Sequence, residues 1–459
     1  MDRDGAPDHG VTLSEAARVW ARIALLSFGG PAGQIAVMHR ILVDEKRWIG
    51  EARFLHALSF CTLLPGPEAQ QLATYIGWLM HRTAGGLIAG GLFVLPGLVS
   101  IMALSLIYAA YGGVGIVGGL FFGLKCAVLA IVLQAVVRVG ARALRNNAMR
   151  TIAGAAFAAI FLFDVPFPLI VLAAGLIGYA GTRGGARSFR AAGHGGAADK
   201  GLPDADSLLG LGVPAHARPN LRRTLAISGV FLALWLGPVL GLVIGLGPDN
   251  VFSAIAVFFS KMAVVTFGGA YAVLAYVAQA AVDTYGWLKP GEMLDGLGLA
   301  ETTPGPLIMV TQFVGFLGAL RQAGSLDPYV AGVLGGLLTT WVTFLPCFLW
   351  IFAGAPYVEA LRENRALSGA LAAITAAVVG VILNLAVWFA LHLLFAETRP
   401  LHPGLGLRLD LPVWTSLRWP ALLLSGAAIL AVFRFRVGVI PTLLAASAAG
   451  VGLHLAGLA

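Results

Sequence analysis

Residues 64–71 read Leu-Pro-Gly-Pro-Glu-Ala-Gln-Gln, and their Pro65-Gly66-Pro67 recurs as Pro304-Gly305-Pro306 in a second apolar stretch. Phe28-Gly29-Gly30 recurs as Phe267-Gly268-Gly269, and both motifs keep one ungapped offset of 239 residues. Internal repetition at a fixed offset indicates a duplicated architecture. The sequence therefore predicts that the two halves of this chain fold alike. The same offset pairs Asp44 with Asp283 and Trp48 with Trp287, and a later offset of 250 pairs Pro96 with Pro346.

The composition of the chain is that of a membrane protein. Of its 459 residues, 58% are hydrophobic and 11% are charged, whereas soluble domains carry about 25% charged residues. Uncharged stretches long enough to cross a bilayer recur from Val19 almost to the C-terminus. The net charge of +8 comes from Lys and Arg in loops beside these stretches, which indicates membrane topology and no nucleic-acid partner. Cys61, Cys126 and Cys347 lie singly in apolar segments, so we expect neither a disulfide framework nor a metal site.

Apolar runs bounded by charged residues define the expected membrane segments. The run at 151–182 is too long for one ordinary span, and Asp164-Val-Pro-Phe-Pro168 is expected to divide it into two short helices. The polar stretch 183–224 is rich in Gly, Arg and Asp and is expected to form a flexible linker. A single span at 225–247 follows it. The other expected segments are 13–38, 54–80, 84–111, 114–138, 251–280, 293–320, 329–356, 367–396, 417–433 and 437–456.

These segments predict an all-α polytopic membrane protein of about 13 transmembrane segments, six in each half and one between them. Because six spans return the chain to its starting side, the connecting span makes the two repeats inverted. Lys and Arg are more numerous on the N-terminal side, which predicts a cytoplasmic N-terminus and a periplasmic C-terminus. If 151–182 is instead one helix, the repeats are parallel. The predicted domains are a first repeat at 1–182, a cytoplasmic linker plus connecting helix at 183–250 and a second repeat at 251–459.

Inverted repeats with interrupted helices place a substrate site near the middle of the bilayer, where helix N-termini offer positive charge to anions. Thr12-Leu-Ser-Glu15 reads as a capping box, and the helix that starts there is expected to end at the first Phe-Gly-Gly. Pro67 and Pro306 suit the first turn of a new helix, whose free N–H groups bind anions. Close packing or a kink is the alternative role of these motifs. The expected anion contacts are Phe28, Gly29, Gly30, Pro65, Gly66, Pro67, Gln70, Thr266, Phe267, Gly268, Gly269, Thr302, Thr303, Pro304, Gly305 and Pro306, with Gln71, Thr311 and Gln312 nearby.

Ionisable residues inside membrane segments are costly and are functional candidates by default. Arg22 and Lys261 are partners at the 239-residue offset, and one cation from each half would suit an anion with two negative charges. Snorkelling to the interface is their alternative role. Lys125 breaks the symmetry, either as a third anion contact or as the partner of a buried acid. Glu68 and Glu301 are candidates for proton coupling, with structural pairing to a buried cation as the alternative.

Other classes of function fit the sequence less well. An intramembrane enzyme needs a nucleophile with a base or a cluster of metal ligands at depth, and the nine histidines are scattered. We therefore expect no catalytic residues, cofactor or metal. An uncoupled anion channel stays open as an alternative, because sequence does not separate it from a carrier.

The motifs resemble those of the long, two-domain type of the CHR family of chromate ion transporters. This resemblance implies a secondary transporter that exports chromate across the bacterial inner membrane and confers chromate resistance. It also implies sulfate as an isosteric competitor, the membrane potential or a proton gradient as the energy source, and two halves fused in opposite orientations. Family membership does not fix the substrate, so a carrier of sulfate or another oxyanion is the alternative. The resemblance runs from about Glu15 to Asn384 and is carried by Phe28-Gly-Gly-Pro31, Leu64-Pro-Gly-Pro-Glu68-Ala-Gln-Gln71, Tyr75-Ile-Gly-Trp78, Gly123-Leu-Lys125, Phe267-Gly-Gly269 and Glu301-Thr-Thr-Pro-Gly-Pro306.

The sequence thus predicts a carrier that exposes a central site alternately to the two faces of the membrane. Its expected partners are a chromate or sulfate dianion, protons and the lipid bilayer, with a homodimer as an option. The coupling stoichiometry and the resting conformation do not follow from the sequence.

Overall fold

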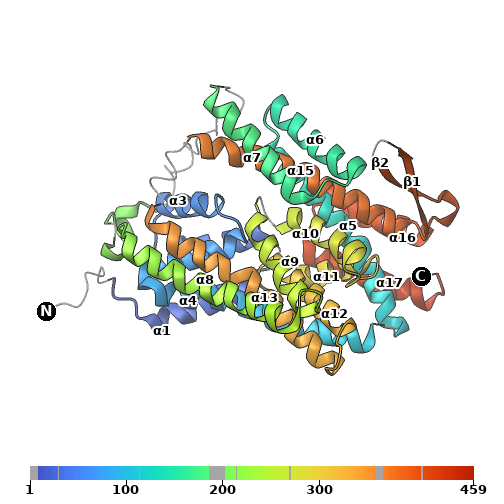
Figure 1. Ribbon diagram of the computed structural model, residues 1–459, viewed down its shortest axis with the longest axis horizontal. Helices are drawn as coiled ribbons and strands as arrows, with labels where there is room; N and C mark the ends of the chain where they lie inside the picture. Colours follow the sequence, from blue (N-terminus) through green and yellow to red (C-terminus); the bar gives the residue numbers. More distant parts are fainter. Residues whose placement is uncertain are drawn as a thin grey trace.

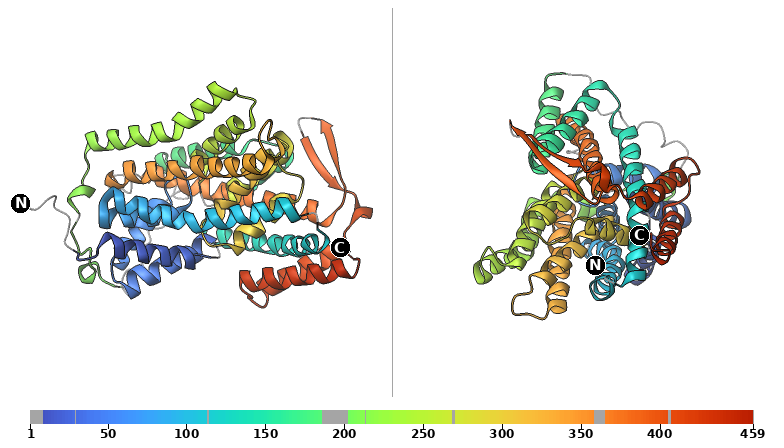
Figure 2. Two further views of the ribbon diagram at one scale, coloured as in Figure 1. Left: turned by 90° about the horizontal axis from the view of Figure 1, so that it is seen from below. Right: turned by 90° about the vertical axis from the view of Figure 1, so that its right-hand side faces the viewer.

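The computed structural model shows an elongated bundle in which most helices run roughly along the long axis (Figure 1 and Figure 2). Helices α1 and α17 lie toward opposite ends of this axis. The expected all-α class is correct for the bulk of the chain. The structure describes residues 9–28, 30–112, 114–185, 202–212, 214–267, 270–357, 365–404 and 407–458.

The first helices end and begin at the motifs that the sequence predicts as helix breaks. The hydroxyl of Thr12 accepts a hydrogen bond of 3.2 Å from the N–H of Glu15 and so caps the first helix. The backbone leaves the helical region at Ser27, and the next helix begins at Gly30, whose φ of +76° suits glycine. These elements are α1 (Leu13–Leu26), α2 (Gly30–His39), a π-helical turn (Arg40–Glu45), α3 (Glu51–Cys61) and α4 (Glu68–Tyr111).

Helix α4 consists of two antiparallel parts joined by a tight turn. The backbone at Arg82 leaves the helical region with a φ of +56°. Across the turn, a Cβ on Gly77 would lie 2.5 Å from the carbonyl oxygen of Gly85, so the two parts touch where side chains are absent. The part at 68–80 is too short to cross a bilayer, whereas the part at 83–111 is long enough.

The rest of the first half is α5 (Gly115–Ala143), α6 (Asn147–Phe163) and α7 (Phe167–Arg183). Asp164 ends α6 in the left-handed region at φ +52°, and Pro166 caps α7. The run at 151–182 is therefore two helices, as the sequence predicts.

The described part of the linker, from 202 onward, is docked against the first half, while residues 186–201 and 213 of the predicted flexible linker at 183–224 lie outside the described residues. The N–H of Glu51 donates to the carbonyl oxygen of Leu202 at 2.9 Å. The guanidinium of Arg53 donates to backbone carbonyls of the linker, the shortest bond being 3.1 Å to Gly212. The ring Nε2 of His216 lies 2.9 Å from the carbonyl oxygen of Trp78. The physical reason is that these helix ends leave polar backbone groups for the linker to pair.

Helix α8 (Leu221–Leu246) connects the halves. Most of its apolar side chains face outward, with Ile244 83% exposed, as expected for a helix that faces lipid, while Phe231, Trp235 and Val239 are buried against the bundle. The second half repeats the order of elements of the first. It contains α9 (Val251–Val265), α10 (Ala270–Gln279), a π-helical turn (Ala280–Thr284), α11 (Glu292–Thr302), a 3-10 turn η6 (Leu307–Met309), α12 (Val310–Arg321), α13 (Pro328–Gly354), α15 (Arg365–Leu394), α16 (Trp419–Phe433) and α17 (Val439–Leu455).

Short helices form hairpins whose two open ends lie together. Lys46, directly after the π-helical turn, forms an ion pair of 3.9 Å with Glu15 in the first turn of α1. Arg321 at the end of α12 forms an ion pair of 2.6 Å with Glu292 at the start of α11. Each of these hairpins therefore starts and ends on the same side of the molecule. We call α1–α2, α3 with the first part of α4, α9–α10 and α11–α12 the short hairpins.

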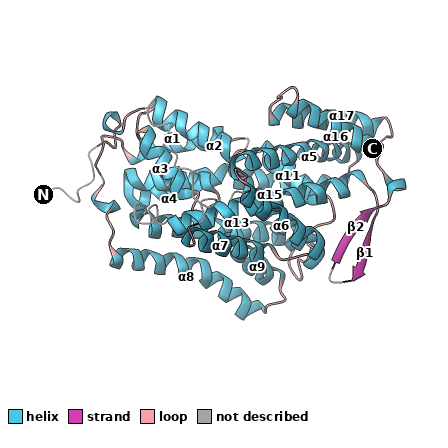
Figure 3. Ribbon diagram, turned by 90° about the horizontal axis from the view of Figure 1, so that it is seen from above, coloured by secondary structure: helices cyan, strands magenta, loops and turns pink. Residues whose placement is uncertain are grey.

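A β-hairpin between α15 and α16 was not predicted. Its strands are β1 (Thr398–Gly404) and β2 (Leu407–Pro412), which pair antiparallel with Thr398 opposite Pro412 (Figure 3). It lies at the same end of the molecule as α17 and leaves the helical bundle intact.

Several described helices are long and apolar enough to cross a membrane. They are α4, α5, α8, α13 with the turn after it, and α15, each with a mean hydropathy of 1.7 or more over its best window. Shorter apolar helices accompany them, including α6, α7, α16 and α17. The chain is accordingly a multi-pass membrane protein.

Candidate functional site

The repeated loops of one half are hydrogen-bonded to those of the other. The N–H of Gly66 donates to the carbonyl oxygen of Thr266 at 2.7 Å. The N–H of Gly305 donates to the carbonyl oxygen of Ser27 at 2.9 Å. The 239-residue offset relates Ser27 to Thr266 and Gly66 to Gly305, so the two bonds are equivalent. We call this region, where each Pro-Gly-Pro bonds the residue directly before the other half's Phe-Gly-Gly, the loop crossing.

Glycine is required at both central positions of the Pro-Gly-Pro motifs. Gly66 has a φ of +127° and Gly305 a φ of +107°, which side chains rarely adopt. A Cβ on Gly66 would lie 2.8 Å from Sγ of Cys347, and a Cβ on Gly305 would lie 3.0 Å from Cα of Gly97. The repeated glycines therefore serve the close approach of the two halves.

Helix N-termini flank the loop crossing. In the first half, α2 begins at Gly30 and α4 begins directly after Pro67. In the second half, α10 begins at Ala270 and η6 begins directly after Pro306. Pro67 and Pro306 are thus the N-cap residues of their helices, whereas the sequence predicts them one position later, in the first turn. Each cross-half hydrogen bond joins two loops, and a helix begins directly after each loop. Two positive helix N-termini therefore lie beside each bond.

Buried glutamines reinforce these loops. Gln34, which the sequence analysis did not single out, donates from Nε2 to the carbonyl oxygen of Gly305 at 2.6 Å and is 1% exposed. Gln71 donates from Nε2 to the carbonyl oxygen of Pro65 at 2.8 Å. Gln70 donates to the hydroxyl of Thr74, and its Oε1 is buried with no partner among the described residues. An orphan oxygen needs a donor, so Gln70 suits a water molecule or a ligand hydroxyl better than a bare oxyanion.

The predicted threonine ligands have their hydroxyl protons engaged elsewhere. Thr266 donates to the carbonyl oxygen of Met262 at 2.6 Å, and Thr302 to that of Leu299 at 2.8 Å. Thr303 likewise donates to a carbonyl of its own helix. This back-bonding engages the hydroxyl protons and leaves acceptor lone pairs, so it does not favour these hydroxyls as anion donors, and their role as anion contacts stays a prediction.

The two predicted acids lie beside the loop crossing. Glu301 is 3% exposed and accepts a hydrogen bond from the hydroxyl of Tyr271, in the first turn of α10. Glu68 is the first residue of α4, at its positive N-terminus. The positive charges of Arg142 and Arg138, near the end of α5, act on Glu68 and Glu301 respectively. The sequence analysis counted these arginines only as topology signals.

The predicted pair of membrane cations lies apart from the loop crossing. Arg22 donates from Nη1 to Glu45 Oε2 at 2.9 Å, and its side chain is 51% exposed. Lys261 is exposed on α9. The reason is helical rotation: a residue five positions before Ser27 lies about 140° away around the helix. These positions do not favour a shared anion between Arg22 and Lys261, which stays a prediction.

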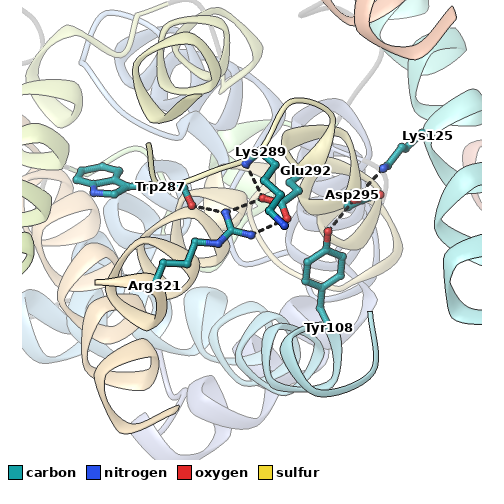
Figure 4. Close-up of polar contacts among 7 residues, drawn as sticks. All are labelled: Tyr108, Lys125, Trp287, Lys289, Glu292, Asp295 and Arg321. Carbon is teal, nitrogen blue, oxygen red and sulfur yellow. Dashed lines mark hydrogen bonds and ion pairs between the residues drawn. The ribbon is translucent and has the colours of Figure 1, made fainter. Parts of the chain in front are cut away.

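Lys125 is paired with a buried acid, which is the second of its two predicted roles (Figure 4). Its Nζ lies 3.1 Å from Oδ2 of Asp295 on α11, and the hydroxyl of Tyr108 donates to the same oxygen at 2.9 Å. Asp295 is 2% exposed, and its Oδ1 has no partner among the described residues. The sequence analysis missed Asp295, although an acid three residues into an apolar segment was a visible signal.

A second ion pair lies next to this one and closes the α11–α12 hairpin (Figure 4). The guanidinium of Arg321 bonds both oxygens of Glu292 at 2.6 and 2.7 Å and also donates to the carbonyl oxygen of Trp287. The N–H of Lys289 donates to the same carboxylate at 2.6 Å. This bidentate geometry fixes the start of α11 and thereby the position of Asp295.

The remaining predicted residues are distributed as follows. Phe28 and Phe267 are half-buried at the loop crossing, as are Pro65 and Pro304. Gly29, Gly268 and Gly269 lie outside the described residues. Among the described residues, no three His, Cys, Asp or Glu side chains are grouped to hold a metal ion.

Comparison with known proteins gives one consistent result. The family model described as Chromate transporter matches residues 14–179 and 253–453. The chain is 33% identical over 365 residues to a chromate transport protein of Pseudomonas aeruginosa, covering 79% of this chain and 77% of that protein. It is 28% identical over 372 residues to a chromate transport protein of Cupriavidus metallidurans, covering 81% of each. An uncharacterized transporter of Bacillus subtilis, YwrB, is 29% identical over 112 residues, covering 24% of this chain and 56% of that protein. No solved structure matches significantly.

Proposed function

We infer, since this chain belongs to the chromate transporter family, that it carries chromate across a membrane. The family and the apolar helices make it a transporter rather than an enzyme. Relatives that cover most of its length are named chromate transport proteins. The observation that carries the mechanism is the reciprocal pair of hydrogen bonds that joins Gly66 to Thr266 and Gly305 to Ser27.

The proposed architecture is two inverted repeats, 1–182 and 251–459, joined by the linker and helix at 183–250. Three observations support it: the family model matches residues within each half, the order of elements repeats, and the cross-half bonds are reciprocal, as a two-fold relation requires. In Figure 1 and Figure 3, α1, α3 and α4 lie toward one end of the long axis, whereas α11 lies nearer its middle.

The short hairpins change the number of spans without changing this orientation. A hairpin that starts and ends on one side enters the membrane without crossing it, so the total is lower than the expected figure of about 13. The ion pairs show one such hairpin in each half, and the repeated order of elements supports a second one in each. Removing two spans from each half leaves an even number, so α8 still inverts the second half.

The proposed substrate site is the loop crossing. The free N–H groups at the starts of α2, α4, α10 and η6 attract a tetrahedral dianion, as helix N-termini do in other transporters. Arg138 and Arg142 add positive charge from α5. Glu68 and Glu301 are the groups proposed to take up protons during the cycle. Neither Arg22 nor Lys261 belongs to this version of the site.

The proposed cycle is alternating access at the loop crossing, with chromate exported across the bacterial inner membrane and chromate resistance as the result. The N-terminus is proposed to be cytoplasmic and the C-terminus periplasmic. Sulfate, which has the same shape and charge as chromate, is the expected competitor. The energy source is the membrane potential or a proton gradient.

Uptake of labelled chromate into inverted vesicles tests this function. We expect saturable uptake that depends on an imposed proton gradient or potential and that excess sulfate inhibits. Vesicles without the protein provide the baseline. Flux that follows the chromate gradient alone and does not saturate would indicate a channel, and no flux above the baseline would refute chromate transport.

Replacing Glu301 with Gln tests the proton step. The amide keeps a hydrogen bond to Tyr271 but cannot exchange a proton. We expect exchange of internal for external chromate to persist while uptake driven by a proton gradient falls at least about tenfold. Equal loss of both activities would assign Glu301 a structural role.

A further inference from the structure

A cavity of about 330 Å³ opens beside Lys125 and is separate from the loop crossing. It lies among the start of α5, the loop before α11 and the ends of α15 and α17. Basic side chains line it: Lys125, His392, Arg418 and His454. Among its described lining residues none is acidic. A cavity of this size is at the lower limit for ligand sites and suits a small ion with a few waters.

Missing side chains create this space. The lining includes Gly115, Gly118, Gly119 and Gly291. A Cβ on Gly115 would lie 2.6 Å from Nε2 of His454, so the glycine lets this imidazole lie against α5. A Cβ on Gly118 would meet nothing within 4 Å, so this position faces open space.

Lys125 connects the cavity to the buried acid. Its side chain lines the cavity and is 26% exposed, and its Nζ bonds the buried Asp295. Asp295 lies on α11, which ends at Thr302, and only Thr303 separates this end from the second Pro-Gly-Pro. An anion in the cavity therefore competes with the Asp295 carboxylate for the Lys125 ammonium. Because Asp295 lies on α11, this competition acts on the helix that leads to the second Pro-Gly-Pro of the loop crossing.

We propose that this cavity is a second anion site, a vestibule that takes a small tetrahedral dianion on the face of the protein where α5 begins. Arg418 and Lys125 supply the charge, and the anion loosens the bond between Lys125 and Asp295 when it binds. The proposed function supplies only the identity of the anion, so the vestibule is tested without measuring transport.

The test uses a cysteine placed in the vestibule. The native cysteines Cys61, Cys126 and Cys347, all buried, are first replaced by serine or alanine. Gly118→Cys then puts a thiol into the cavity, and Ser325→Cys puts one in the exposed loop between α12 and α13 as a matched control. Membrane-impermeant thiosulfonates, one anionic and one cationic, report the local potential through their relative rates of reaction.

We expect the ratio of anionic to cationic rates to be at least about tenfold higher at position 118 than at position 325, as a focused positive field predicts. Arg418→Gln should lower the ratio at 118 alone. Sodium chromate should slow labelling at 118 and not at 325, with full recovery of thiols after its removal. Asp295→Asn frees Lys125 from its ion pair, so a lower chromate concentration should protect the thiol at position 118 from labelling.

Equal ratios at the two positions, or chromate protection at neither, would overturn the vestibule. Labelling at position 118 is compared in vesicles of zwitterionic lipid and in vesicles that contain anionic lipid. This comparison distinguishes a soluble dianion from a lipid headgroup as the ligand of the vestibule. Protection by anionic lipid with none by chromate would also overturn it. Chromate uptake by the native chain, without the Gly118 change, is measured in parallel: protection at position 118 without native uptake refutes the proposed function and keeps the vestibule, and native uptake without protection does the reverse.

Discussion

The backbone N–H of Gly66 donates a hydrogen bond of 2.7 Å to the carbonyl oxygen of Thr266 in the other half of the chain. Gly305 and Ser27 repeat this bond at the equivalent positions. Each half thus completes the backbone hydrogen bonding of the other. The alternating-access cycle proposed above predicts that a relative movement of the halves breaks both bonds together.

Alanine at Gly66 or Gly305 should reduce chromate uptake strongly. The side chain strains a backbone of positive φ, at a cost of about 1–3 kcal/mol, and meets Sγ of Cys347 or the backbone of Gly97. Uptake into vesicles at matched protein levels measures the effect. Gly241→Ala in α8 is the control, because its Cβ would meet nothing within 4 Å. Normal uptake by both loop variants would contradict a role for the crossing.

Replacing Gln34 with Leu should destabilise the loop crossing. The buried amide donates to Gly305 at 2.6 Å, and its loss leaves a buried carbonyl unpaired, at a cost of about 1–3 kcal/mol. Thermal unfolding in detergent should show a lower midpoint. Gln322→Leu is the matched control: this exposed amide donates to the carbonyl of Tyr285 at 3.2 Å, and its removal should have less effect. Equal shifts of the unfolding midpoint for the two variants would indicate that the hydrogen bond of Gln34 contributes no more to stability than that of the exposed Gln322.

The ion pair between Lys125 and Asp295 should show strong coupling. Asp295→Asn leaves a partly buried ammonium without its counter-charge, and removal of one partner of a buried pair costs about 3–5 kcal/mol. The double variant with Lys125→Gln should therefore be more stable than the sum of the single effects predicts. A double-mutant cycle on unfolding midpoints measures this coupling, and additive effects would show that the two residues act independently.

Docking of the linker should weaken at acidic pH. Burial lowers the pKa of His216 below its ordinary 6.5. The hydrogen bond to the carbonyl of Trp78 raises this pKa and opposes the shift, whereas the positive charges of Arg223 and Arg82 lower it further. The undocked histidine thus binds a proton more readily, so docking is strongest above pH 6.5 and weakens as the pH falls through that value. Hydrogen exchange in 202–217, corrected for the intrinsic rate, should rise accordingly.

The variant His216→Gln checks the cause of this pH dependence. The amide is able to donate to the carbonyl of Trp78 and does not titrate in this range. Its linker exchange should be independent of pH between 5 and 7, a range of roughly the width over which histidine titrates. Persistence of the pH dependence in this variant would assign it to another group.

Local motifs determined much of the fold directly from the sequence. Pro67 and Pro306 stand directly before the helices that follow them, where a missing donor costs nothing, and Asp164 before Val-Pro ends α6 for a similarly local reason. The regular offset between the halves likewise follows from sequence identity alone. These features need no knowledge of distant contacts.

The sequence did not show which side chains and segments contact one another. Arg22 bonds Glu45, Lys125 bonds Asp295, and the linker binds the first half, because each contact depends on where distant helices lie. Hydropathy also identified the segment at 54–80 but could not show that it turns back at Pro65-Gly66-Pro67.

The sequence by itself determined an apolar, duplicated, helical membrane chain with breaks at fixed positions, since backbone chemistry and hydrophobicity act residue by residue. Only the tertiary structure decided that the breaks of one half bond those of the other and that Asp295 holds Lys125. Hydrogen bonds and ion pairs require atoms about 3 Å apart, and that proximity is a property of the folded chain.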